Sequence, residues 1–309
     1  MYIIRRVLTM LLTVWVIATL TFILMKLIPG DPFSTEEGAL PEEALENLYA
    51  KYGLDDPLPI QYLTYMKNLL TFDLGISMEG SGRSVNDIIA SGLGASATLG
   101  LLTLLIALVF GVTLGIIAAL YHNSIFDYTA MVIATVGISV PNFILAPLLM
   151  KFLAVDLQVF PVANWGTWQH AVLPSIALAS GPLAIIARFV RSSMLDVINQ
   201  DYMKTADAKG LPTYRILFLH GIRNAILPVV SFIGPLFVSL ITGTLVIERI
   251  FSVPGIGRYF VDSIFNRDYT VIMGTTIFYS VILVVVLFLI DVSYRFIDPR
   301  ITLTSKGGS

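Results

Sequence analysis

Residues 201–228 read DYMKTADAKGLPTYRILFLHGIRNAILP, a polar and mostly basic stretch between two long apolar runs. The whole chain is 56% apolar and only 13% charged, whereas an ordinary soluble domain has about 25% charged residues. The stretch is longer than the usual connection between membrane spans, is rich in helix formers, and contains a Gly-Leu-Pro turn at 210–212. We interpret it as a surface that docks a partner; the alternative is an ordinary solvated helical connection.

Six apolar stretches are long enough to cross a bilayer, because a hydrocarbon core of about 30 Å needs about 20 helical residues. Asp, Glu, Lys and Arg are absent from 97–120, 129–150 and 225–247. One such charge at the bilayer centre would cost about 2.5–3.5 kcal/mol. The alternation expected of barrel strands is also missing. The sequence therefore predicts an all-α, polytopic membrane protein with six transmembrane helices, at 7–28, 97–120, 129–153, 171–190, 225–247 and 271–291.

Basic residues gather before the first apolar run, in the fourth connection, and after the last run. By the positive-inside rule these regions are cytoplasmic, which places both termini in the cytoplasm and the acidic segment 29–95 outside. The first run is too long for a typical signal-peptide core, so we expect it to be retained as a helix.

This topology predicts four parts of the chain. They are an N-terminal transmembrane helix (1–28), an extracytoplasmic cap (29–95), a core domain of five transmembrane helices (96–301) with a cytoplasmic loop at 191–224, and a C-terminal tail (302–309). In the cap, 41–52 and 58–70 have the spacing of amphipathic helices. We expect their apolar faces to lie against the outer membrane surface, the mouth of the pore or the other outer loops. These faces consist of Ala44, Leu45, Leu48, Tyr49 and Tyr52, and of Tyr62, Leu63, Met66, Leu69 and Leu70.

Small residues and prolines mark particular points in the spans. Gly111 and Gly115 form a GxxxG pair, which lets two helix backbones approach closely. Pro141 and Pro147 in the third span, Pro174 and Pro182 in the fourth, and Pro235 in the fifth are expected to bend their helices. A gating role for 139–142 is one hypothesis; rigid packing is the other.

No motif in the chain predicts catalysis. There is no phosphate-binding G-x-x-x-x-G-K-[ST] loop and no H-E-x-x-H, and the three histidines are far apart in sequence. The spans also lack the ionisable residues that ion-driven carriers use for coupling. We therefore predict that the chain is not an enzyme and holds no metal or cofactor of its own. If it is a transporter, its energy comes from another chain.

The order and spacing of ten short segments resemble the membrane permease subunits of bacterial peptide-type ABC importers, a family that handles oligopeptides, dipeptides and nickel. The resemblance covers nearly the whole chain and is closest to the B-type oligopeptide permease. The segments are LIPGDPF (27–33), LPEE (40–43), KYGLDDP (51–57), DLG (73–75), SVPNF (139–143), RFVR (188–191), TADAKGL (205–211), VPGIG (253–257), NRDY (266–269) and IDPR (297–300). The loop departs from the wider importer pattern, since Lys204 stands where an acidic residue is usual.

The resemblance implies the type I membrane-domain fold of ABC importers, in the bacterial cytoplasmic membrane. It implies ATP-driven import of oligopeptides by alternating access, with a second homologous permease, two cytoplasmic ATPase subunits that bind ATP and magnesium, and an extracytoplasmic peptide-binding protein. No nucleic acid is expected. Alternatives are import of dipeptides, nickel chelates or sugars on the same architecture, or a stand-alone channel or ion-driven carrier.

The resemblance also assigns candidate sites. The 196–211 segment would enter a groove of one ATPase, where Ala206 and Gly210 permit close approach. Its coupling residues would be Asp201, Tyr202, Lys204, Thr205, Ala206, Asp207, Lys209 and Gly210. The candidate substrate path contains Ser139, Asn142, Ser231, Ser239 and Thr242, and the candidate binding-protein contact or outer gate contains Glu248, Arg249, Arg258, Arg267 and Asp268.

Overall fold

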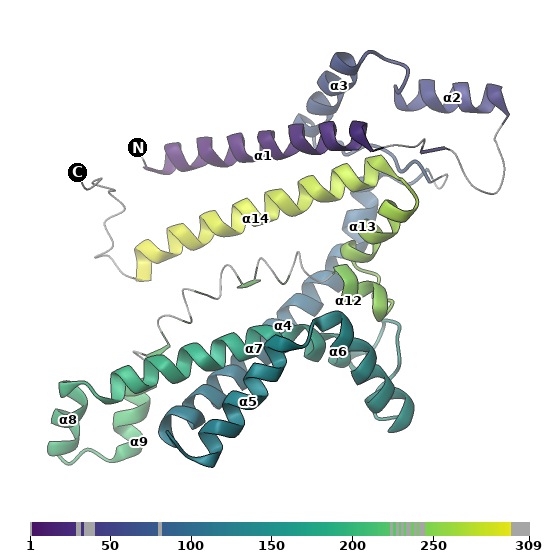
Figure 1. The fold of residues 1–309 in the computed structure, drawn as a ribbon. Helices are drawn as coiled ribbons and strands as arrows, with labels where there is room; N and C mark the ends of the chain where they lie inside the picture. Colours follow the sequence, from purple (N-terminus) through teal and green to yellow (C-terminus); the bar gives the residue numbers. More distant parts are fainter. Residues whose placement is uncertain are drawn as a thin grey trace. The chain divides into compact units, whose positions relative to one another are not determined.

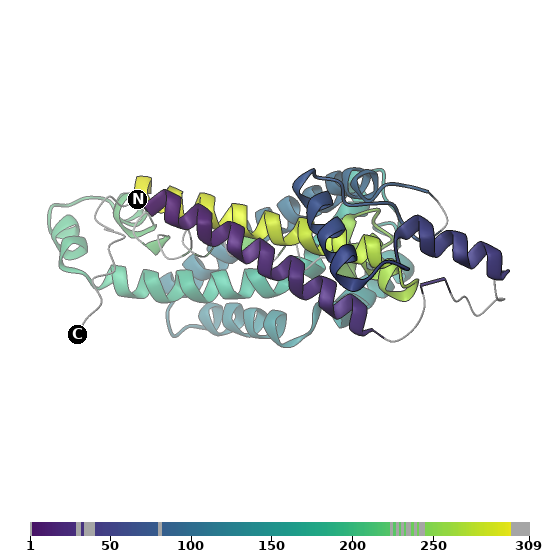
Figure 2. The ribbon, with the colours of Figure 1, turned by 90° about the horizontal axis from the view of Figure 1, so that it is seen from above.

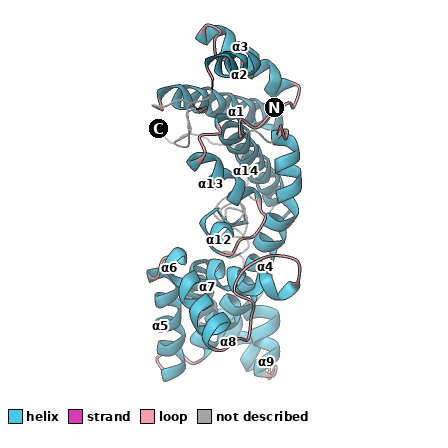
Figure 3. Cartoon of the chain, turned by 90° about the vertical axis from the view of Figure 1, so that its right-hand side faces the viewer, coloured by secondary structure: helices cyan, strands magenta, loops and turns pink. Residues whose placement is uncertain are grey.

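The computed structural model describes residues 2–28, 32–33, 41–79, 82–222, 225–226, 229, 232, 236–237, 240 and 245–297. Across these residues, helices and the loops between them make up the fold (Figure 3), and the one extended pairing is an isolated bridge between Ile76 and Ser84. The chain divides into two compact units, Met1–Gly92 with Tyr259–Ser309, and Leu93–Arg258. The first unit therefore joins the two ends of the chain.

In the first unit, α1 (Tyr2–Leu27) and α14 (Tyr269–Ile297) pack along each other (Figures 1 and 2). Both helices are apolar along most of their length, and the outward face of α1 exposes large side chains such as Leu8, Leu11 and Leu12. Such a face is stable in lipid, where exposed apolar surface has no cost. The first apolar run is thus a helix that packs against the last one.

The two predicted cap helices are confirmed as α2 (Glu42–Tyr52) and α3 (Leu58–Leu70). Gly53 ends α2 in the left-handed conformation (φ +63°), which glycine adopts without the steric cost of a Cβ. All five residues on the predicted apolar face of α2 are partly buried.

The five residues on the apolar face of α3 differ in exposure within the chain. Leu63 and Leu70 are 66% and 80% exposed, whereas Tyr65 turns inward. Tyr62 and Tyr65 both pack on the ring of Phe22 from α1, with ring centroids 5.4 and 5.8 Å apart. Part of the apolar face of α3 therefore packs inside the unit beside Tyr65, while Leu63 and Leu70 remain exposed.

The second unit contains most of α4 (Val85–Leu120), which begins in the first unit. It continues with α5 (Ile125–Ser139), α6 (Asn142–Leu149), the π-helical turn η1 (Met150–Asp156) and α7 (Trp168–Ile198). The helix α5 packs along α7. Gly111 and Gly115 also bring α4 so close to α7 that a Cβ on either glycine would lie within 3 Å of the α7 backbone.

The third apolar run was predicted as one span, 129–153, but it forms two helices bent by 107° between α5 and α6. The break falls at Val140, which is extended (φ −90°, ψ 115°) and precedes Pro141. Proline clashes with a helical residue before it and has no N–H to donate, so the hydrogen bonds of the α5 helix end there. In contrast, α7 remains one helix through both Pro174 and Pro182.

Within the described residues, four helices are long and apolar enough to cross a membrane, or five if the bent pair is one span. The predicted fifth span, 225–247, and Pro235 within it lie mostly outside the described part of the chain, as does the 302–309 tail. After this gap come α12 (Leu245–Ile250) and α13 (Ile256–Phe265). The total of six spans stays a prediction.

Candidate functional site

The segment after α7 folds into a compact helical unit, which we call the knob. It consists of α8 (Asp201–Ala208), α9 (Thr213–Ile216) and η2 (Leu217–Ile222), and Figure 1 shows α8 and α9 beside each other at the C-terminal end of α7. Met203, Ala206 and Ile216 are buried against one another, with Val197 and Leu211 packed around them. This small core holds the knob in shape, so a partner would meet a preformed surface.

The outer surface of the knob is polar. The Lys204 ammonium lies 3.2 Å from the Asp201 carboxylate, and the two side chains are 70% and 98% exposed. Such an exposed ion pair contributes only about 0–1 kcal/mol, so a partner could replace it at little cost. Tyr202 and Lys209 are also exposed, while the Thr205 hydroxyl donates to the Asp201 carbonyl. The side chain of Asp207 lies outside the described residues.

The structure also shows the positions of Ala206 and Gly210 within the knob. Ala206 is 7% exposed and fills the core of the knob instead of facing outward. Gly210 has φ +74°, and no atom lies within 4 Å of the position that a Cβ would occupy. Glycine is therefore needed there for its left-handed backbone at the end of α8, and not because its own chain crowds it.

A charged cluster that sequence reasoning missed joins three helices beside this segment. The Arg191 guanidinium binds both oxygens of the Asp127 carboxylate, at 2.6 and 2.7 Å. The Asn123 backbone N–H donates to Asp127 at 3.0 Å, and the His122 ring nitrogen lies 3.1 Å from it. The Asp127 side chain is only 2% exposed, so the cluster ties the α4–α5 turn to the last turns of α7, where the knob begins. Its members lie up to 69 residues apart, and no local pattern links them.

Two of the five outer-gate candidates are buried carboxylates. Glu248 is fully buried and accepts from the Ser96 hydroxyl at 2.7 Å and the Arg258 backbone N–H at 3.1 Å. The Ser96 oxygen in turn accepts from the Ile256 N–H at 3.0 Å. Glu248 thus anchors the VPGIG loop (253–257) to α4. A Cβ on Gly255 would collide with its carboxylate, which explains a glycine there.

Asp268 caps α14. It is 1% exposed, accepts from the Val271 N–H at 3.1 Å, and accepts from the Ser77 hydroxyl at 2.5 Å. The backbone oxygen of Ser77 also accepts from the Tyr52 phenol. Burial, and secondarily the negative charge of Asp268, raises the pKa of Tyr52, which keeps this phenol a donor. Asp268 therefore holds a cap loop on the start of α14 and does not face outward.

The remaining candidates are spread over the chain. Arg249 and Arg267 are exposed and Arg258 is partly buried; Arg249 and Arg258 belong to the second unit and Arg267 to the first. In the candidate path, the Ser139 hydroxyl bonds its own helix at the Thr135 carbonyl, and Asn142 accepts from the Ser180 hydroxyl at 3.2 Å. The other three path candidates, Ser231, Ser239 and Thr242, lie outside the described residues.

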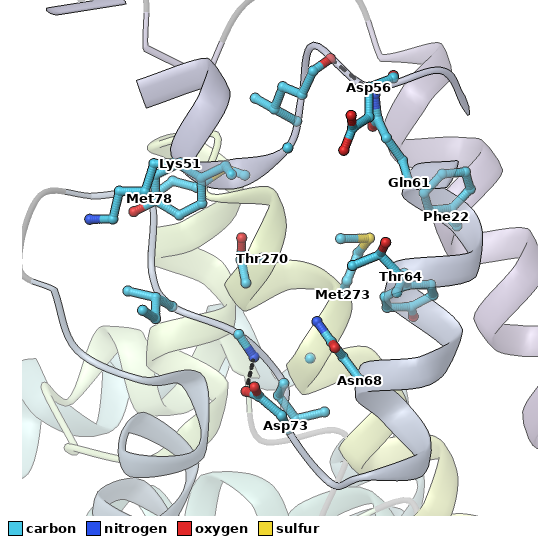
Figure 4. Close-up of a pocket in the computed structure, with 18 of the residues that line it drawn as sticks. Phe22, Lys51, Asp56, Gln61, Thr64, Asn68, Asp73, Met78, Thr270 and Met273 are labelled. Carbon is cyan, nitrogen blue, oxygen red and sulfur yellow. Dashed lines mark hydrogen bonds between the residues drawn. The ribbon is translucent and has the colours of Figure 1, made fainter. Parts of the chain in front are cut away.

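The first unit also contains a pocket of about 450 Å³ between the cap and the adjacent ends of α1 and α14. Figure 4 shows Gln61, Thr64 and Asn68 on the α3 side, and Thr270 and Met273 on the α14 side. The volume and mixed lining are those of a small-molecule site. The Tyr65 hydroxyl is buried in its wall with no partner among the described residues, and burial raises the pKa of this phenol. The described residues contain no cluster of metal-ligating side chains.

Glu248 provides the first testable consequence. Replacing it by alanine leaves the partly buried Arg258 N–H in the first turn of α13 without its acceptor, which costs about 1–3 kcal/mol. We expect trypsin to cleave Glu248→Ala after Arg258 at least several-fold faster than the wild type. Glu46→Gln, which alters an exposed carboxylate on α2, is the control and should be cleaved at the wild-type rate. Equal protection of the loop in Glu248→Ala would contradict an anchoring role.

Solved structures define the class of protein first. The MetNI methionine ABC transporter in an inward-facing conformation matches with a TM-score of 0.57 over 68% of this chain and 96% of that chain, at 18% identity. An amino acid ABC transporter matches with a TM-score of 0.55 over 68% and 94%, at 16% identity. The fold is that of an ABC importer membrane domain, as the sequence predicted.

Sequence comparison then identifies the family. The model of the binding-protein-dependent transport system inner membrane component matches residues 111–303, and that of its N-terminal region matches residues 1–89. The chain is 53% identical to the dipeptide transport system permease protein of Bacillus subtilis over 99% of both chains. It is 43% identical to the oligopeptide transport system permease protein of Salmonella typhimurium over 97% of this chain and 98% of that one. The chain therefore belongs to this family of inner-membrane, multi-pass proteins, as a permease subunit of the peptide-type ABC importers, and it is not itself an enzyme.

Proposed function

We propose that this chain forms half of a membrane pore that imports short peptides, driven by ATP hydrolysis in partner chains. The observation that carries the proposal is the preformed knob at the end of α7, with a buried core and a charged outer face. A peptide cannot cross lipid unaided, because its charged termini and unpaired amides are too costly to dehydrate. A pore with alternating access would replace water on each side in turn.

The partners follow from the family and from the knob. A second homologous permease would complete the pore, and an outer binding protein would deliver the peptide. Two cytoplasmic ATPases would bind ATP and magnesium, one of them at the knob. This orientation places the α8–α9 end of the second unit and both termini in the cytoplasm, in agreement with the inside-positive charge of residues 188–223. Arg249 and Arg258 are the basic residues that we assign to the binding-protein contact.

The length of the transported peptide is a separate point of the proposal. The sequence favoured oligopeptides, whereas a relative with 53% identity carries a dipeptide name and one with 43% an oligopeptide name. A path lined by hydroxyls and amides such as Ser139 and Asn142 would read the peptide backbone and tolerate many side chains. We retain oligopeptides as the proposal and dipeptides as the alternative that transport must decide.

The deciding experiment reconstitutes the chain with the ATPases that co-purify with it and a candidate binding protein. ATP hydrolysis should rise when the binding protein is loaded with peptide, and a series of dipeptides, tripeptides and pentapeptides should identify the preferred length. If no ATPase co-purifies and vesicles of the lone chain still move solute, the protein is a channel or carrier.

Charge reversal on the knob tests the coupling assignment. Lys204→Glu with Lys209→Glu should lower peptide-stimulated ATP hydrolysis and uptake at least ten-fold, because the ATPase contact would lose its charge complementarity. Both side chains are exposed, so the amount of folded protein in the membrane should not change. The control is Lys67→Glu, an exposed lysine on α3. Undiminished uptake in the double variant would exclude these lysines from coupling.

A further inference from the structure

A second cavity of the first unit, about 490 Å³ in volume, opens between the C-terminal part of α1, α13 and the start of α14. We call it the α1–α14 groove. Its wall is made mainly by Leu24, Met25, Ile28, Phe260, Ile264 and Ile272. Its volume falls within the range of about 300–1,000 Å³ in which proteins bind small molecules.

The wall of the groove offers no free polar group to an occupant. Three hydroxyl-bearing residues line the groove. Thr21 donates to the Ile17 carbonyl at 2.8 Å, and Thr276 donates to the Ile272 carbonyl at 2.7 Å. The third, Tyr269, is only 9% exposed and already interacts with its own chain. A peptide or a loop in this space would leave its backbone amides without partners, which is costly. The part of a bound molecule that contacts this wall must therefore be a hydrocarbon chain.

The groove has a cation at its rim. Arg267 lines the cavity and is exposed, and its guanidinium makes no hydrogen bond or ion pair with any described residue. The adjacent acid does not neutralise it, because the Asp268 carboxylate is buried and accepts from Ser77 and Val271. A planar guanidinium is well suited to bind phosphate oxygens in pairs.

The position of the groove places it against lipid. Its helices supply two of the membrane-spanning candidates, Ile4–Leu27 and Tyr269–Leu289, and Arg267 lies two residues before the second of these. Arg267 is therefore at the depth of the lipid headgroups. Next to it, Leu24, Ile264 and Phe265 expose apolar side chains, which in a bilayer would contact acyl chains.

From this division between an apolar wall and a cationic rim, we propose that the α1–α14 groove binds one phospholipid. An acyl chain lies along the wall, and the Arg267 guanidinium binds the phosphate. A bound lipid of this kind would fasten α1, α13 and α14 together at one surface of the membrane. This assignment gives Arg267 a role other than the binding-protein contact that the sequence suggested.

Native mass spectrometry of the whole chain in detergent, titrated with phosphatidylglycerol, tests the charge. We expect Arg267→Gln to weaken binding of the first phosphatidylglycerol at least ten-fold and Arg267→Lys to retain part of it. Arg5→Gln removes an exposed cation at the opposite end of α1 and should bind as the wild type does. A glycosyl diacylglycerol, which has the same chains but no phosphate, should bind the wild type no better than phosphatidylglycerol binds Arg267→Gln.

A second pair of variants tests the wall. Leu24→Trp places a bulky ring in the groove and should also reduce phosphatidylglycerol binding at least ten-fold. Leu12→Trp is the matched control, because Leu12 and Leu24 are both 57% exposed on α1 and Leu12 lies outside the groove. Wild-type binding by Arg267→Gln or by Leu24→Trp would overturn the proposal. So would loss of the lipid when the chain is purified with its partner permease, since the groove would then be a protein interface.

Discussion

Replacing Gly115 by alanine should lower the stability of the helical core more than any other single-methyl change in α4. The added Cβ would lie 2.6 Å from the Ala187 carbonyl oxygen and 2.6 Å from the Val190 Cβ, both on α7. Neither atom can move independently, because one is backbone and the other is attached directly to it. The two helices would therefore have to move apart to relieve the clash. Overpacking of this kind costs about 1–3 kcal/mol. Thermal unfolding in detergent should show a clearly lower midpoint and less folded protein.

The same helix provides both a second site and a control. A Cβ on Gly111 would lie 2.8 Å from the Leu183 carbonyl, so the double variant Gly111→Ala, Gly115→Ala should lose more than Gly115→Ala alone. Gly94 lies in the same helix with no atom within 4 Å of a Cβ. Since alanine favours helix over glycine by about 1 kcal/mol, Gly94→Ala should be neutral or stabilising. A Gly115→Ala protein as stable as Gly94→Ala would mean that α4 and α7 do not pack this closely.

The GxxxG pair illustrates what spacing can and cannot predict. The sequence indicated close helix contact at Gly111 and Gly115, because small side chains leave the backbone accessible. It did not indicate that α7 is the partner, since α7 begins more than fifty residues later. Likewise, the inner face of α2 followed from helical period, whereas that of α3 depends on Phe22 in another helix.

Local chemistry predicted the elements, and tertiary contacts determined the roles of the site residues. Pro141 signalled a bend in the third span, but the angle of 107° depends on where α6 packs. Glu248 and Asp268 were predicted to belong to a binding-protein contact or outer gate. Their actual partners, Ser96 and Ser77, lie 152 and 191 residues away, and these contacts bury both carboxylates. A single sequence gives no measure of such distant pairs.

Replacing Asp127 should have the second large effect on stability. Among the described residues of α5, Asp127 is the one acid in the charged cluster beside the knob. Asp127→Ala removes both bonds between Asp127 and the Arg191 guanidinium, which is only 26% exposed, and leaves the Asn123 N–H without its acceptor. Removing one partner of a buried pair costs about 3–5 kcal/mol; partial exposure of Arg191 places the expected loss near the lower value. Because Arg191 is close to the start of the knob, coupled ATP hydrolysis should fall together with the midpoint of thermal unfolding.

Two comparisons separate this buried pair from an ordinary surface contact. Asp156→Asn breaks the Lys151–Asp156 ion pair, whose side chains are 62% and 44% exposed, and should change stability by about 0–1 kcal/mol. Replacing both Asp127 and Arg191 by alanine should be less damaging than the sum of the single changes, because no charge is then left without a partner. If Asp127→Ala resembled Asp156→Asn, or if the double variant lost the full sum, the cluster would not join α5 to α7. An intact pair holds the two helices together at the point where the knob begins, so a force applied to the knob would reach both helices at once.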